Sequence, residues 1–153
     1  MKVVLSFLLL TSYIGYSQIA MPFEEAKKKG ISPKVDSIYK SAIDSREGYP
    51  AVFKKEKDIE RHTEAYYNYI RGFMGFLEKN NFKWEETTRS FNRIYIQPNG
   101  TIDYFLYQLK GLKPEKEKEF RRLLSIYIKE HKFGNTAPEK FAQCSPVTYS
   151  KSS

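Results

Sequence analysis

The sequence Phe91-Asn-Arg-Ile-Tyr-Ile-Gln-Pro-Asn-Gly-Thr-Ile-Asp-Tyr-Phe-Leu-Tyr-Gln-Leu109 decides the fold. Two runs rich in Ile, Tyr and Phe flank Pro98-Asn99-Gly100, a combination typical of a β-hairpin turn. Proline presets φ at the first turn position, and glycine accepts a left-handed conformation at the third. The spacing therefore predicts a three-residue loop in which Gln97 faces Thr101.

Pairing outward from this loop predicts which residues share a face of the hairpin. The expected cross-strand pairs on one face are Ile96 with Ile102, Ile94 with Tyr104, and Asn92 with Leu106. The other face would carry Arg93, Tyr95, Asp103, Phe105 and Tyr107. Because both faces bear large side chains, at least one of them must be covered by another part of the chain.

Four side chains of that second face form a candidate ligand site: Arg93, Tyr95, Phe105 and Tyr107. Exposed aromatic rings gathered in a patch can stack on sugars or bind a peptide. The alternative is that the amphipathic turns around Val35, Ile38 and Tyr39 fold over this face and bury it. That arrangement would also give those turns a surface to pack against.

The first residues have the features of a secretory signal peptide. Lys2 precedes an apolar run, and Gly15 and Ser17 are small residues at the usual positions before a cleavage site at Gln18. We therefore expect residues 1–17 to be a cleaved signal peptide and the mature protein to be periplasmic or secreted. No later stretch is apolar for long enough to span a membrane. The mature chain is predicted to divide into a helical lead-in at 18–48 and an α+β domain at 49–150.

Charge gives little support for a nucleic-acid partner. The chain has 26 Lys and Arg residues against 18 Asp and Glu residues, a net charge of +8. Basic and acidic residues alternate, as in Lys54-Lys55-Glu56-Lys57-Asp58, which is typical of solvated helix faces. We expect no nucleic-acid binding, and an anion-binding surface is an alternative that depends on the charge alone.

Helical periodicity is strongest in two later segments. Apolar residues recur at helical spacing through 56–79, and Pro114 begins a second helical pattern. Residues 141–149 have the composition of a last strand, and Pro146 marks it as an edge strand or a strand with a bulge, because proline donates no ladder hydrogen bond. We predict an α+β fold with a three-stranded antiparallel sheet, formed by the hairpin and the C-terminal strand. Two long helices pack against this sheet, with short helices at the N-terminus.

The order of these elements follows a known pattern. The features that carry it are Tyr49-Pro50, the strand at 94–96, the turn Asn99-Gly100, the strand at 102–106, the helix at 120–128 and the strand at 141–149. Together they resemble the C-terminal domain of TonB, the energy transducer of Gram-negative envelopes, over residues 49–149. The chain departs from that pattern in lacking a proline-rich spacer, in having Ala51-Val52 for a glycine pair, and in having Lys132-Phe133-Gly134 for a Trp-x-Pro stretch. The resemblance implies this fold and the binding of extended peptides, but not energy transduction.

No residue pattern predicts catalysis, a metal site or a cofactor. Cys144 with His62 or His131 could form a thiol–imidazole pair, but no nucleophile motif surrounds the cysteine. Neither histidine has a Cys or a carboxylate at ligand spacing. We predict a non-catalytic protein-binding or structural module of the bacterial envelope. The alternative is a small secreted hydrolase or glycan-binding protein that uses the aromatic hairpin face.

The last strand supplies the candidate partner site. A free edge there would bind a partner strand through main-chain hydrogen bonds. The side chains expected to give selectivity are Phe141, Gln143, Val147 and Tyr149. The same edge would permit a homodimer by edge-to-edge pairing.

Overall fold

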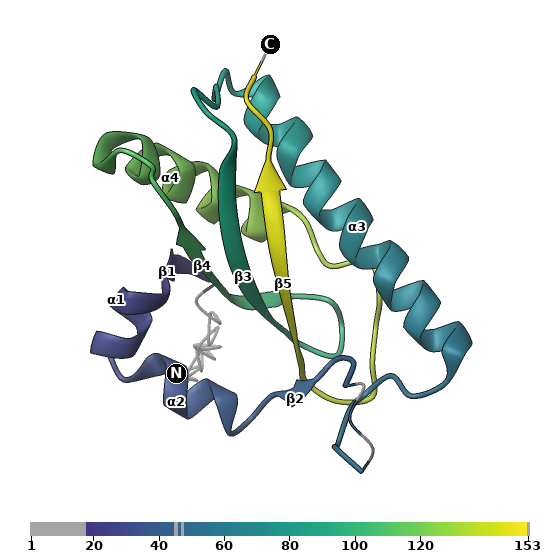
Figure 1. Cartoon of the computed structure of the whole chain (residues 1–153). Coiled ribbons are helices and arrows are strands. Elements are labelled where there is room, and N and C mark those ends of the chain that lie inside the picture. Colours follow the sequence, from purple (N-terminus) through teal and green to yellow (C-terminus); the bar gives the residue numbers. More distant parts are fainter. Residues whose placement is uncertain (1–17, 45, 47, 153) are drawn as a thin grey trace, which may run out of the picture.

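The fold is built on a five-stranded mixed sheet with the strand order β1-β4-β3-β5-β2 (Figure 1). The computed structural model describes residues 18–44, 46 and 48–152, so the predicted signal peptide lies outside the described residues. In chain order the elements are β1 (Ile19–Pro22), α1 (Phe23–Lys28), α2 (Ile31–Asp36), β2 (Lys40–Ser41), α3 (Glu56–Lys79), β3 (Thr88–Ile96), β4 (Ile102–Leu109), α4 (Pro114–Glu130) and β5 (Phe141–Tyr149).

The predicted hairpin and its three-residue loop are confirmed in β3 and β4. The Gln97 N–H donates to the Thr101 carbonyl over 2.8 Å, and the Gly100 N–H donates to the Gln97 carbonyl over 2.9 Å. Gly100 has a φ of 82°, which glycine adopts without strain. A Cβ at this position would also lie 2.4 Å from the Phe133 carbonyl oxygen, so the turn requires glycine for two reasons.

A β-bulge next to this turn changes the register of the hairpin. The observed pairs are Ile96 with Ile102, Tyr95 with Tyr104, Ile94 with Phe105, and Asn92 with Tyr107. The first pair is as predicted. The predicted partners of Ile94 and Asn92 are wrong by one residue, because Asp103 is an extra residue in β4. A shift of one residue exchanges the two faces of a strand, so Phe105 and Tyr107 lie on the face opposite to the predicted one.

The sheet contains two strands that the sequence did not reveal, so the prediction of a three-stranded antiparallel sheet is wrong. β1 pairs with β4 in parallel, and β2 pairs in parallel with the beginning of β5. These strands have only four and two residues, too few to show an alternating pattern. Both come from the predicted lead-in, which therefore belongs to the same sheet as the rest of the chain.

Helices α3 and α4 lie on one face of the sheet and enclose the main core (Figure 1). Phe120 of α4 is fully buried near the centre of this core. Its ring centroid lies 5.2–6.1 Å from those of five aromatic residues: Phe73, Phe82, Trp84, Tyr107 and Tyr149. The two helices approach closely at Gly72, where a Cβ would lie 2.5 Å from the Tyr127 hydroxyl. None of the helices in the described part of the chain is long and apolar enough to cross a membrane.

Helices α1 and α2 cover part of the opposite face with a smaller apolar cluster. Its buried members are Met21, Ala26, Val35, Tyr39, Tyr95, Leu106 and Ala142. The alternative to an exposed ligand face, in which the turns at Val35 and Tyr39 cover this side of the hairpin, is the arrangement observed. Ile38 was expected to join them, but its side chain is 49% exposed.

Candidate binding site at the end of β5

The structure does not bring together the four side chains of the predicted aromatic face. Phe105 and Tyr107 are fully buried in the main core, because the bulge turns them toward α3 and α4. Tyr95 is fully buried on the other face, where its hydroxyl donates to Asp36 over 2.6 Å. Arg93 is half-buried beside it and forms an ion pair with Asp36 at 3.0 Å. Arg93 and Tyr95 hold α2 on the sheet, and the four predicted residues do not form an exposed aromatic patch.

The backbone groups along the outer edge of β5 belong to its even-numbered residues. The Ala42 N–H donates to the Ala142 carbonyl over 2.9 Å, which shows that the backbone groups of Ala142 point away from β3. Because backbone groups alternate in direction along a strand, those of Cys144, Pro146 and Thr148 point outward too. Among the described residues, no strand pairs with this edge beyond Ala142. Pro146 thus stands where its missing N–H removes no hydrogen bond to β3.

The four residues predicted to contact a partner along β5 do not direct their backbone groups toward its free edge. Phe141 and Tyr149 are buried in the main core, and Val147 packs against that core. Gln143 bonds through its amide oxygen to His62 Nε2 over 2.7 Å, on the side of α3. The backbone groups of these odd-numbered residues point toward β3. The free edge itself therefore offers a different set of atoms from the predicted one.

Side chains of β5 cap the carbonyl groups at the centre of this edge. Gln143 Nε2 donates to the Cys144 carbonyl over 2.9 Å, and Ser145 Oγ donates to the Pro146 carbonyl over 3.1 Å. Such capping lowers the capacity of an edge to pair with another strand. In the part of the chain that the structure describes, Thr148 is the one residue of this edge whose outward N–H and C=O both lack a hydrogen-bond partner. The edge is therefore open at the end of β5.

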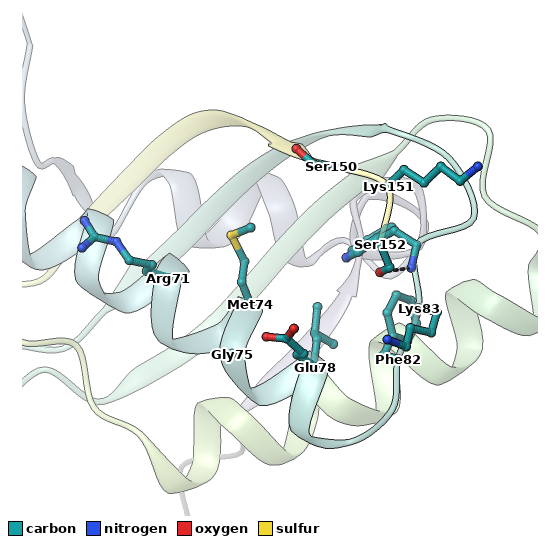
Figure 2. Close-up of a pocket in the computed structure, with 11 residues that line it drawn as sticks. Arg71, Met74, Gly75, Glu78, Phe82, Lys83, Ser150, Lys151 and Ser152 are labelled. Carbon is teal, nitrogen blue, oxygen red and sulfur yellow. Dashed lines mark hydrogen bonds between the residues drawn. The ribbon is translucent and has the colours of Figure 1, made fainter.

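A hollow of about 450 Å³ lies beside this open end (Figure 2). Its lining residues come from the end of α3, from the segment that follows α3, and from the segment that follows β5: Arg71, Met74, Gly75, Leu77, Glu78, Phe82, Lys83, Trp84, Ser150, Lys151 and Ser152. We call this the α3–β5 hollow. In Figure 2, Met74 and Glu78 lie on α3, and Lys151 and Ser152 lie across the hollow from them.

One wall of the α3–β5 hollow is fixed by contacts between distant segments. The Ser152 N–H donates to the Trp84 carbonyl over 2.9 Å, and the Trp84 N–H donates to Ser152 Oγ over 2.9 Å. The Trp84 ring also stacks on Tyr149, with centroids 4.4 Å apart and planes 11° apart. These contacts hold the segment after β5 against the segment after α3, so this end of the hollow has a defined shape.

The charge of the α3–β5 hollow is positive. Arg71, Lys83 and Lys151 line it together with a single carboxylate, Glu78. None of these three cations forms an ion pair with another described residue. The buried floor beneath them is apolar and includes Leu77 and Phe82. The hollow can therefore accept a ligand that combines an anionic group with an apolar part.

The sheet separates the residues considered for nucleophilic chemistry. Cys144 is exposed on the face that carries Arg93, whereas His62 and His131 lie on the opposite side with α3 and α4. Partial desolvation raises the pKa of the Cys144 thiol, and burial lowers the pKa of His62. The described residues contain no group of three His, Cys, Asp or Glu side chains that could hold a metal ion. This geometry does not provide the thiol–imidazole pair that the sequence left open.

Comparisons with protein-family models, with curated proteins and with solved structures find no match to this chain. No relative therefore indicates a functional site, and the candidate site is defined by the geometry of this chain alone. Sequence reasoning missed the α3–β5 hollow because its residues come from three separate segments. The one available signal was Met74, an apolar residue near the polar side of α3 that is 38% exposed.

Proposed function

We propose that this protein is an exported, non-catalytic binding module of the bacterial envelope, and that its partner is an extended peptide segment. The signal-peptide pattern of residues 1–17 supports export. The likeness of the element order to the TonB C-terminal domain supports an envelope protein that binds peptides. The peptide adds to the open end of β5 and lies beside α3.

The observation that carries this proposal is the free bonding capacity of Thr148 beside the α3–β5 hollow. An added strand gains main-chain hydrogen bonds from an edge whose N–H and C=O are unpaired, and neighbouring side chains give selectivity. Thr148 offers both groups, and Met74 of α3 lines the hollow that also includes Ser150, at the same end of the strand. The position therefore combines a backbone template with a place for side chains.

The same geometry favours a foreign peptide over a second copy of the chain. A symmetric pairing of two β5 edges about Pro146 would set two prolines opposite each other, neither with an N–H to donate. The side chains of Gln143 and Ser145 already donate hydrogen bonds to the carbonyl groups of Cys144 and Pro146. An edge-to-edge homodimer centred on Pro146 would thus lack main-chain bonds at its centre. A short peptide at the open end avoids this capped region.

The test is a selection of peptides from random libraries against the purified protein, followed by binding measurements on two matched variants. One library displays peptides with a free C-terminus and the other displays them internally. Thr148→Pro removes the outward N–H without removing a bond to β3, and Thr148→Ala keeps that N–H. We expect selected peptides to bind Thr148→Ala like the unmodified protein and to bind Thr148→Pro about threefold to tenfold more weakly.

A third variant, Met74→Glu, protects this test against a folding defect. Met74 is partly exposed, so Met74→Glu should fold normally while placing a charge in the docking position. Weaker peptide binding by Met74→Glu, at an unchanged melting temperature, would support the proposal. Failure of both libraries to yield a binder would overturn it. Equal affinity of the selected peptides for all of the variants would overturn it as well.

A further inference from the structure

We infer that the α3–β5 hollow binds the free C-terminal carboxylate of the docked peptide, and that this peptide runs parallel to β5. The inference rests on the proposed function and specifies its ligand. It follows from three features of the molecule: the direction of the strand that already occupies this edge, the wall that closes the hollow, and the balance of charge around it.

The direction of the added strand is indicated by β2. β2 pairs with Phe141 and Ala142 on the same edge of β5, and it does so in parallel. The chain then leaves this edge, which is unpaired from Cys144 to Tyr149 among the described residues. A peptide in line with β2 and in the same direction would carry its C-terminus toward the α3–β5 hollow. An antiparallel peptide would bring its N-terminus there instead.

The far wall of the hollow favours a chain end at this position. Phe82 and Lys83 lie beyond the end of β5, next to Ser152 (Figure 2). Two hydrogen bonds between Trp84 and Ser152 attach this segment to the one that follows β5. The ring stack of Trp84 on Tyr149 holds this wall from the core side. We expect an added strand that continued in line to meet this wall. A strand that ends in the hollow would not.

The charge selects which end of a peptide fits. Arg71, Lys83 and Lys151 give three positive charges against the one negative charge of Glu78. A terminal amine would add a fourth positive charge, whereas a carboxylate can accept charge-assisted hydrogen bonds from the ammonium groups of Lys83 and Lys151, which lie at the opposite end of the hollow from Arg71 (Figure 2). The apolar floor of Leu77 and Phe82 suits an apolar side chain on the last residue of the peptide. The ligand class is thus a peptide with a free carboxyl end and an apolar last residue.

The experiment compares one selected peptide as the free acid and as the C-terminal amide, by fluorescence anisotropy at low ionic strength. Losing one charge-assisted contact should weaken the amide about tenfold relative to the acid. In the triple variant Arg71→Gln, Lys83→Gln, Lys151→Gln, the acid should bind as weakly as the amide does, while the amide keeps its affinity. Glu78→Gln is the matched control, and it should strengthen binding of the acid because it removes the opposing charge.

The outcomes separate this inference from the proposed function. Equal binding of acid and amide, by peptides whose affinity still falls with Thr148→Pro, would overturn the carboxylate site and leave the peptide-binding function standing. Selected peptides that derive from the internal library alone would have the same consequence. The absence of any binder from either library would overturn both. Melting temperatures of the variants check that each charge substitution leaves the fold intact.

Discussion

On the face of the sheet covered by α3 and α4, the contacts are mostly between aromatic rings and aliphatic side chains. On the other face, α1 and α2 are held by a small apolar cluster and by polar anchors. Arg121 of α4 binds Glu25 through two hydrogen bonds of 2.5 and 3.1 Å and donates to the Ala20 carbonyl over 3.0 Å. Tyr39 donates its hydroxyl to Asp103.

The difference follows from the length of the covering helices. Helices α3 and α4 have 24 and 17 residues and can each present a continuous apolar stripe to the sheet. Helices α1 and α2 have six residues each and bury one residue apiece, Ala26 and Val35. Such short segments gain little from apolar burial, so ion pairs and hydrogen bonds must fix their position. The two faces should therefore respond differently to substitution.

The largest effect is expected at Phe120. Phe120→Ala removes a fully buried ring from the centre of the main core and leaves a cavity among five aromatic neighbours. The free energy of unfolding should fall by about 3–5 kcal/mol. Urea denaturation followed by tryptophan fluorescence measures this directly, because Trp84 lies 5.8 Å from the Phe120 ring.

The matched control for Phe120 is Phe23 on the other face. Its ring is half-exposed and lies 5.9 Å from that of Phe91, which is itself 41% exposed. Phe23→Ala should lower the free energy of unfolding by about 1 kcal/mol, since little buried area is lost. A loss at Phe23 as large as that at Phe120 would contradict the contrast between the two faces.

The sequence predicted the parts of the fold that repeat over many residues. Of the two long helices predicted, only α3 is long, but both α3 and α4 follow from apolar residues recurring at helical spacing. The hairpin follows from turn residues whose conformational preferences are specific, above all Gly100. The bulge at Asp103 was not predicted because one extra residue leaves no mark in the composition of a strand. Its consequence was large, since it moved Phe105 and Tyr107 from the predicted ligand face into the main core.

The candidate site was predictable only in part. β5 is not an edge strand over its whole length, because β2 pairs with its first two residues, but Pro146 lies in the part that has no strand on its outer side among the described residues. Which residues point outward from that edge depends on the pairing of β2, a strand of two residues with no sequence signal. The α3–β5 hollow depends on Trp84 meeting Ser152, a contact between segments 68 residues apart. Local patterns cannot report such a contact.

An intermediate effect is expected at the ion pair that holds α1 to α4. The hydrogen bond from Arg121, together with that from Lys29, lowers the pKa of Glu25 to about 2. Because this pKa is below that of a carboxyl group in the unfolded chain, the unfolded state binds the extra proton first as the pH falls. The stabilisation by Glu25 is present above about pH 4.5 and is lost as the pH falls toward 2. Glu25→Gln should therefore lower stability by about 1 kcal/mol at neutral pH.

The pH dependence distinguishes this pair from a general effect of charge. Glu24→Gln removes an exposed neighbouring carboxylate that has no ion pair among the described residues. The stability difference between Glu25→Gln and Glu24→Gln should be present at pH 7 and should shrink toward zero at pH 2. Amide exchange of Ala20 and Met21 would report the same loss locally. A difference that persists unchanged at pH 2 would rule out the ion pair as its cause.

The smallest effect is expected at Cys144, on the part of the sheet that α1 and α2 leave uncovered. Its thiol is exposed and lies away from both histidines, so Cys144→Ser exchanges one small polar group for another at the surface. The free energy of unfolding should change by less than about 1 kcal/mol, and binding of selected peptides should be unchanged, because the outward backbone groups of β5 are retained. Thermal denaturation and anisotropy measure the two quantities. Loss of binding at an unchanged melting temperature would give the thiol a direct role, and would show that the uncovered part of this face takes part in recognition.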